Sequence, residues 1–86
     1  MISGKQIRAA RGLLGWSQQR LADEALVSRS SITRLESEQG EFDQNAGTME
    51  LVRRALENAG INFLFDDGSG AEGVRMRKNK GKSSRR

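Results

Sequence analysis

The sequence has no cysteine, no histidine and no long apolar run. Without cysteine, disulfides and thiolate metal sites are excluded, and a reducing, intracellular compartment fits best. Without histidine, the chain lacks the commonest general base and the commonest metal ligand. No apolar run approaches the roughly 18 residues of a membrane span, and the N-terminus lacks the apolar core of a signal peptide. We therefore expect a cytoplasmic protein that is not an enzyme, needs no cofactor and does not engage a membrane.

The length of 86 residues suits one small domain with a modest hydrophobic core. Its formal net charge of +4 is unevenly distributed. Residues 75–86 contain seven basic side chains and no acidic one, which leaves eight of the fifteen basic and all eleven acidic side chains in the first 74 residues, a net charge of −3. The body is mildly acidic, and its basic tail would attract any polyanion, including RNA or a membrane surface.

Capping residues and apolar periodicity predict four helices, over residues 4–14, 18–25, 29–37 and 49–59. Ser3 and Gln6 have the spacing of a capping box at the start of the first helix. Ser17 and Ser28 are the expected caps of the second and third helices, and Thr48 is the expected cap of the fourth. Because the second and third helices are separated by only three residues, they should meet at a tight corner.

Beyond the fourth helix, the apolar period changes from helical to alternating. The segments INFLF (residues 61–65) and VRMRK (residues 74–78) are typical of strands, so we predict a β-hairpin over residues 61–78. The intervening DDGSG (residues 66–70) is better explained as a turn than as a calcium loop, because it lacks spaced ligands and a terminal glutamate. The last segment, residues 79–86, has no apolar side chain and is predicted to be a disordered basic tail.

The segment SRSSITRLE (residues 28–36) raises the question of function. Its apolar residues, Ile32 and Leu35, point to one side of a helix at about 100° per residue. The opposite side, within an arc of about 140°, carries only hydrogen-bonding groups, from Arg29, Ser30, Thr33 and Arg34. Such a face suits the major groove of DNA, because arginine can bond guanine through two contacts and serine and threonine adapt to several bases. Considered alone, these residues fit a solvated helix face equally well.

The wider segment SQQRLADEALVSRSSITRLE (residues 17–36) resembles the helix-turn-helix of the lambda repressor/Cro-like family, also called the XRE family. The resemblance rests on eight positions at fixed spacing, namely Gln18, Leu21, Ala22, Val27, Ser28, Ile32, Leu35 and Glu36. Ala22 must be small because two helices cross there. The resemblance implies a mainly α fold, a lambda repressor-like four-helix domain over residues 1–60, to which this chain adds the C-terminal hairpin and tail.

The resemblance also implies which residues bind DNA. Arg29, Ser30 and Arg34 occupy base-reading positions, with Thr33 beside them, and Gln18 would contact phosphate and brace Arg29. The full predicted set is Gln18, Ser28, Arg29, Ser30, Ser31, Thr33, Arg34, Gln44 and Asn45, the last two contacting phosphate from the loop before the fourth helix. Arg11 and Glu36 match a structural ion pair between the first and third helices, so neither is assigned to DNA.

The corner between the two helices departs from the family pattern, because Leu26 stands where the family usually has glycine. A leucine in the left-handed backbone region costs about 1 kcal/mol or more. Either this turn avoids that conformation, or burial of Leu26 compensates for the cost.

We therefore expect a transcriptional regulator, acting as a dimeric repressor on a pseudo-palindromic operator and potentially controlling its own gene. The expected partners are double-stranded DNA, a second copy paired through a hairpin edge, and a regulatory partner protein. A rival interpretation is an interaction module, such as an antitoxin or anti-activator, that retains the helix-turn-helix fold. A third is RNA binding through the tail. Trp16 is expected in the core rather than as a stacking platform, and no catalytic constellation is apparent.

Overall fold

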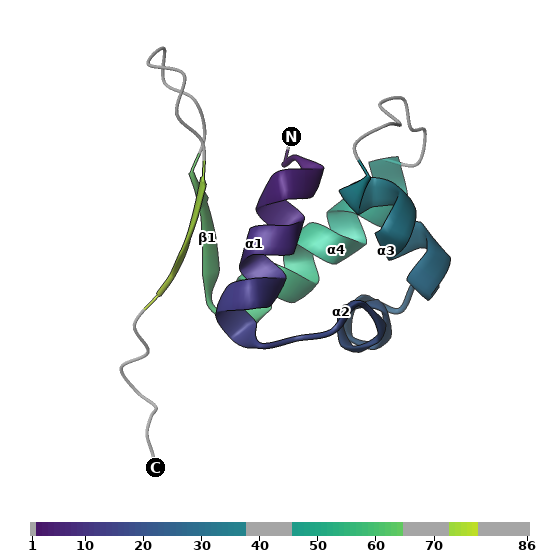
Figure 1. Cartoon of the computed structure of the whole chain (residues 1–86), viewed down its shortest axis with the longest axis horizontal. Helices are drawn as coiled ribbons and strands as arrows, with labels where there is room; N and C mark the ends of the chain where they lie inside the picture. The colour runs from purple at the N-terminus through teal and green to yellow at the C-terminus, as the bar shows by residue number, and fades with distance from the viewer. Residues whose placement is uncertain (1, 38–45, 65–72, 78–86) are drawn as a thin grey trace.

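The computed structural model describes residues 2–37, 46–64 and 73–77. They form four helices followed by an antiparallel two-stranded hairpin (Figure 1). The elements in chain order are α1 (Gly4–Leu14), α2 (Gln18–Ala25), α3 (Arg29–Glu36), α4 (Ala46–Asn58), β1 (Ile61–Leu64) and β2 (Gly73–Met76). The predicted mainly α fold with a C-terminal hairpin is confirmed. The predicted turn at residues 66–70 and the predicted tail at residues 79–86 lie outside the described residues.

Serine caps explain where the first three helices begin. The side chains of Ser3, Ser17 and Ser28 each accept a hydrogen bond from the backbone N–H three residues further on. In α1 the capping box is complete, because Oε1 of Gln6 also accepts from the backbone N–H of Ser3 at 2.9 Å. These bonds satisfy backbone donors that have no partner inside the helix. All three predicted caps are confirmed.

Helix α4 begins earlier than the sequence predicted. It starts at Ala46, so Thr48 lies within its first turn instead of capping it, and the predicted start at residue 49 is wrong. The reason is that alanine is the best helix former, and a β-branched threonine is only mildly unfavourable inside a helix. At the other end, α4 stops at Asn58 and Gly60 follows with a positive φ of 108°.

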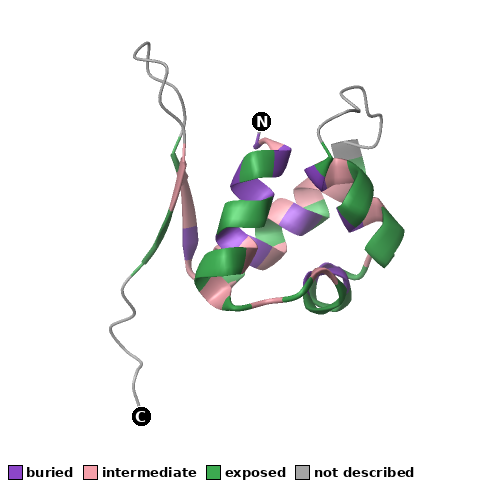
Figure 2. Ribbon diagram, viewed as in Figure 1, coloured by how far each residue is buried: buried purple, intermediate pink, exposed green. Residues whose placement is uncertain are grey.

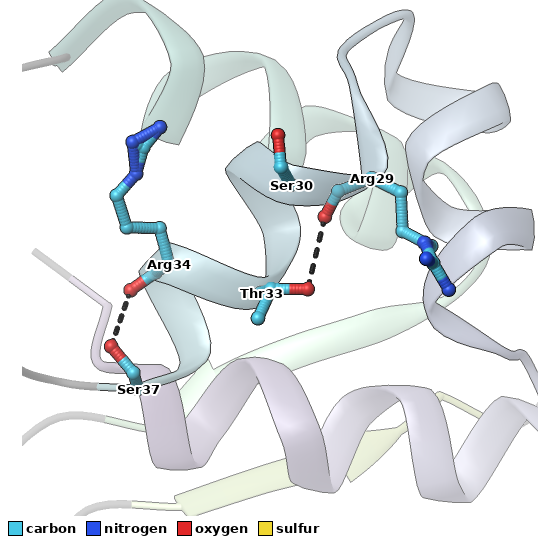
Figure 3. Close-up of a pocket in the computed structure, with 5 residues that line it drawn as sticks. All are labelled: Arg29, Ser30, Thr33, Arg34 and Ser37. Atoms are coloured by element: carbon cyan, nitrogen blue, oxygen red, sulfur yellow. Dashed lines mark hydrogen bonds between the residues drawn. The ribbon is translucent and has the colours of Figure 1, made fainter.

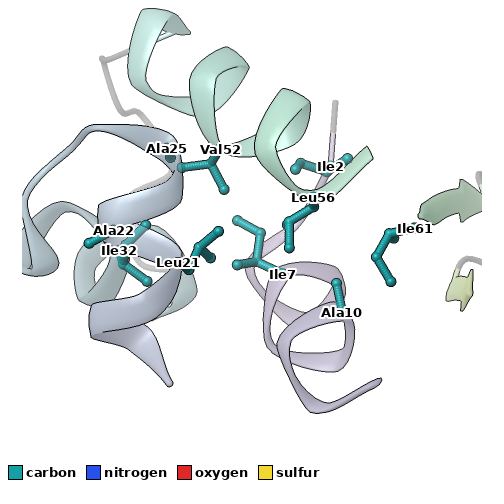
Figure 4. Packing of buried hydrophobic residues seen from close by; sticks show 10 residues of the cluster. All are labelled: Ile2, Ile7, Ala10, Leu21, Ala22, Ala25, Ile32, Val52, Leu56 and Ile61. Carbon is teal, nitrogen blue, oxygen red and sulfur yellow. The ribbon is translucent and has the colours of Figure 1, made fainter. Parts of the chain in front are cut away.

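One hydrophobic core joins the helices and the hairpin (Figures 2 and 4). Its buried members are Ile2, Ile7, Ala10, Leu21, Ala22, Ala25, Ile32, Val52, Leu56 and Ile61. Ala22 is fully buried, as expected where α2 meets α3, and Ile61 brings β1 into the same core. Trp16 packs against this core with its ring half-buried, and the guanidinium of Arg20 lies 4.8 Å from the ring centroid. The predicted core role of Trp16 is confirmed.

The side chain of Gln6 hydrogen-bonds the hairpin to α1. Ile61 lies opposite Met76 and Leu64 lies opposite Gly73 in the strand register. Nε2 of Gln6 donates to the carbonyl oxygens of Leu64 and Gly73, each at 2.9 Å. The same side chain therefore caps α1 with its oxygen and holds both strands with its nitrogen. In Figure 1 the hairpin and α3 lie on opposite sides of α1.

The C-terminal end of α3 is held against the first turn of α1. A β-carbon at Gly4 would lie 2.5 Å from the backbone oxygen of Leu35 and 2.9 Å from that of Glu36. Nη1 of Arg8 also donates to the backbone oxygen of Glu36 at 3.2 Å. Because backbone atoms cannot move aside as a side chain can, only glycine permits this approach. The contact sets the orientation of α3 relative to the other helices.

Candidate nucleic-acid interface

The outward side of α3 presents a shallow hollow of about 400 Å³ (Figure 3). The residues that line it, hereafter the α3 face, are Arg29, Ser30, Thr33, Arg34 and Ser37. Ile32, on the other side of the helix, is fully buried. Sequence reasoning missed Ser37, which it treated only as the end of the helix. Its angular position, about 80° from Arg29 at about 100° per residue, was the signal that could have found it.

The two arginines of the α3 face differ from the other arginines of the four helices. The other five arginines all form hydrogen bonds or ion pairs; they are Arg8, Arg11, Arg20, Arg53 and Arg54. Arg29 and Arg34 are exposed, and their guanidinium groups have no partner within residues 2–37, 46–64 and 73–77. Figure 3 shows these groups extending away from each other, on either side of Ser30 and Thr33. Their donors are therefore available to an external acceptor.

Ser28 and Ser31 belong to the first turn of α3. Oγ of Ser28 accepts from the backbone N–H of Ser31 at 3.1 Å, and the two hydroxyl oxygens lie 3.0 Å apart. The hydroxyl of Ser30 lies 3.4 Å from that of Ser28. Ser28 and Ser30 are exposed and Ser31 is half-buried. This cluster fixes the start of the helix that carries both unpaired arginines.

Gln18, at the start of α2, is bonded to α3 but not to Arg29. Its Nε2 donates to Oε1 of Glu36 at 3.1 Å, and its Oε1 accepts from the hydroxyl of Thr33 at 3.1 Å. The expected bracing of Arg29 by Gln18 is thus replaced by bracing of Thr33. The physical reason is the carboxylate of Glu36, which attracts the amide NH₂ group and turns the amide oxygen toward Thr33.

The predicted ion pair between Arg11 and Glu36 is confirmed. Nε of Arg11 lies 2.7 Å from Oε2 of Glu36, and Nη2 lies 2.9 Å from Oε1. Nη1 of Arg11 donates to the backbone oxygen of Trp16 at 3.0 Å. The hydrogen bond with Glu36 raises the pKa of Arg11 above its ordinary value, although partial burial opposes this. This largely buried pair connects α1 to α3 on the side of α3 away from solvent. It therefore helps to hold the α3 face in position.

The corner between α2 and α3 contradicts both alternatives that the sequence left open. Leu26 adopts the left-handed region, with φ 62° and ψ 42°, and its side chain is 85% exposed. The turn therefore does not avoid the conformation, and burial does not compensate for it. The bonds that end α2 hold this geometry, because the backbone N–H of Leu26 donates to Asp23 and that of Val27 donates to Ala22.

Gln44 and Asn45 lie outside the described residues, so their contacts with phosphate stay predictions. None of the helices in the described part of the chain is both long and apolar enough to cross a membrane.

Residues 7–46 match a family model for helix-turn-helix domains. The matched segment contains the whole of α2 and α3 and ends at the first residue of α4. This segment is similar to the lambda repressor-like, or XRE, helix-turn-helix domains. The matched family is one of DNA-binding regulatory domains, and the match supports a DNA-binding regulator in general. A comparison with curated proteins found no match.

Proposed function

We propose that the protein is a transcriptional repressor that binds a pseudo-palindromic operator as a dimer, with α3 in the major groove. The observation that carries the proposal is the α3 face. Among the described residues, the guanidinium groups of Arg29 and Arg34 have no hydrogen-bond or ion-pair partner, while the other helical arginines do. An arginine without an intramolecular partner loses no such bond when it binds a ligand. All of its donors can be used on the O6 and N7 atoms of guanine or on phosphate.

The charge of the rest of the body supports one orientation on DNA. The first 74 residues have a net charge of −3, so most of this surface gains little from a polyanion. A cationic patch on an otherwise acidic body directs the encounter through that patch. The α3 face is also held by the ion pair of Arg11 with Glu36 and by the close approach at Gly4. Little reorganisation is then needed when the helix enters a groove that is wide enough to admit it.

A dimer suits such a reader, because a two-fold protein matches a palindromic site whose half-sites lie whole DNA turns apart, about 34 Å per turn. The hairpin offers the contact surface. Leu64 lies on the side of β1 opposite to the core-facing Ile61 and Phe63, and it is 41% exposed. In the described part of the chain, each strand of the hairpin also has one edge with no further strand beside it. The hairpin lies across α1 from α3, so its pairing would leave the α3 face open.

Repression requires only that the bound dimer occupies a promoter, and the first site to test is the region upstream of the protein's own gene. Footprinting should reveal a protected site with two-fold symmetry. Arg29→Ala and Arg34→Ala should each weaken binding to that site by about 1–3 kcal/mol and relax the preference at one or two base pairs per half-site.

The matched control is Arg54→Ala, which removes an exposed arginine that is paired with Glu50 on α4. This variant should bind as tightly as the parent, and circular dichroism should be the same for all three variants. If Arg29→Ala and Arg34→Ala both bind like the parent, α3 is not the reading helix. A protein that binds no DNA but captures the product of an adjacent gene would instead be an antitoxin or anti-activator.

A further inference from the structure

A chain of hydrogen bonds with fixed direction runs from the interior to the α3 face. It begins at Arg11, whose guanidinium can only donate, and passes to the carboxylate of Glu36, which can only accept. Gln18 must therefore present its NH₂ group to Glu36, which it does at 3.1 Å. This leaves the amide oxygen of Gln18 directed at the next member of the chain, Thr33.

The hydroxyl of Thr33 has one hydrogen, and two acceptors lie beside it. The amide oxygen of Gln18 is 3.1 Å away and the backbone oxygen of Arg29 is 3.2 Å away, the latter drawn in Figure 3. No group among the described residues donates to this hydroxyl. The hydrogen is therefore directed toward the protein, and the lone pairs of Oγ1 remain for a ligand on the α3 face.

We propose that Thr33 is a specificity-determining residue that acts only as an acceptor and so selects an amino base over a keto base. In the major groove, adenine N6 and cytosine N4 carry donors, whereas guanine O6 and thymine O4 are acceptors. Threonine can in general serve either kind of base. Here the series of hydrogen bonds that starts at Arg11 directs the hydroxyl hydrogen of Thr33 toward the protein, so Thr33 cannot donate to a base. The inference rests on the proposed function, because it requires α3 to face base edges.

Gln18 is then a positioning residue for Thr33. Its amide oxygen accepts from the hydroxyl of Thr33, and its bond to Glu36 fixes the orientation of the amide. Gln18 itself does not contact the base. Any contact of Gln18 with phosphate would change affinity for all sequences alike, because phosphate contacts carry no sequence information. An effect of Gln18 on the choice of base must therefore pass through Thr33.

The experiment measures relative affinities for a set of duplexes in which each base pair of the footprinted site is varied to all four bases. Thr33→Val keeps the shape of the side chain and removes the oxygen, and Thr33→Ser keeps the oxygen. At one position per half-site, read on the strand whose base faces Thr33, the parent should prefer both adenine and cytosine to guanine and thymine. Thr33→Val should reduce this preference by about three- to tenfold. Thr33→Ser should retain it.

Gln18→Met, which can neither donate to Glu36 nor accept from Thr33, should weaken the same preference in the parent but have no effect on it in the Thr33→Val background. The proposal is overturned if the position that Thr33→Val changes separates A·T from G·C pairs, or purines from pyrimidines, instead of separating adenine and cytosine from guanine and thymine on one strand. It is also overturned if Thr33→Val changes no preference while Arg34→Ala does, a result that leaves the proposed function intact. If neither substitution changes any preference, both proposals fail.

Discussion

Leu26 has a backbone conformation that leucine normally avoids, at a site where its side chain gains almost nothing from burial. The left-handed region costs a residue with a β-carbon about 1–2 kcal/mol. Leu26 is the one non-glycine residue with positive φ in the described part of the chain, and it is 85% exposed. Packing of α2 and α3 on the common core offsets this cost, because their positions there require this corner.

Replacement of Leu26 by glycine should therefore stabilise the protein. Relief of the strain exceeds the extra chain entropy of glycine, and the expected gain is about 0.5–1 kcal/mol. Urea unfolding would measure it as a higher midpoint with an unchanged slope. Leu26→Ala is the matched control, because it removes the side chain but keeps the β-carbon, so its midpoint should stay near that of the parent. A lower midpoint for Leu26→Gly would contradict this explanation.

At the scale of elements, the hairpin depends on the first turn of α1. Gln6 is 2% exposed and uses both ends of its amide, one to cap α1 and the other to bond the two strands. The strands also contribute Ile61 to the core, with Phe63 and Val74 packed against it. A two-stranded hairpin is marginal alone in water. Its order therefore depends on this docking.

Gln6→Glu tests the docking with minimal change of shape. The carboxylate can still accept from the backbone of Ser3, but it faces two carbonyl oxygens with no hydrogen to offer. Loss of these bonds should destabilise the fold by about 2–3 kcal/mol and speed amide exchange in β1 and β2 more than in α2. Gln19→Glu makes the same change on the exposed side of α2 and should cost only a few tenths of a kcal/mol. Unaltered protection of the strand amides would show that Gln6 does not hold the hairpin.

At the scale of the whole molecule, the α3 face and the hairpin lie on opposite sides of α1. One core connects them, so both surfaces belong to a single packed unit. This arrangement separates the proposed reading surface from the proposed pairing surface. A change in the hairpin can then alter assembly while the α3 face keeps its structure.

The dimer can be tested by sedimentation of the free protein. We expect a dimer at tens of micromolar, and we expect Leu64→Glu to shift it to the monomer, because the charge would be buried between two hairpins. Leu51→Glu is the matched control, since Leu51 is a leucine of α4 with nearly the same exposure, 42% against 41%. Leu51→Glu should leave the dimer intact. A monomeric parent, or equal behaviour of the two variants, would exclude pairing through the hairpin.

Much of the fold could be predicted from local patterns in the sequence. The capping serines act on backbone groups three residues away, so they mark where α1, α2 and α3 begin without any knowledge of the fold. The 100° helical period likewise places Ser30 and Arg34 about 160° from Ile32. The start of α4 was less predictable, because Thr48 has the chemistry of a cap but is also tolerated inside a helix. Ser37 was missed because the sequence analysis treated it only as the end of the third helix.

The sequence by itself therefore determined where α1, α2 and α3 begin, the resemblance to helix-turn-helix domains and the polar side of α3, since each depends on residues close together in the chain. Only the tertiary structure decided which arginines are paired, which partner Gln18 takes, that Leu26 is strained and exposed, and that Gln6 holds the hairpin. The bond from Gln6 to Gly73 spans 67 positions, and that from Gln18 to Glu36 spans 18. Such contacts form when packing of the core brings distant segments together, and no local pattern encodes which donors and acceptors will then meet.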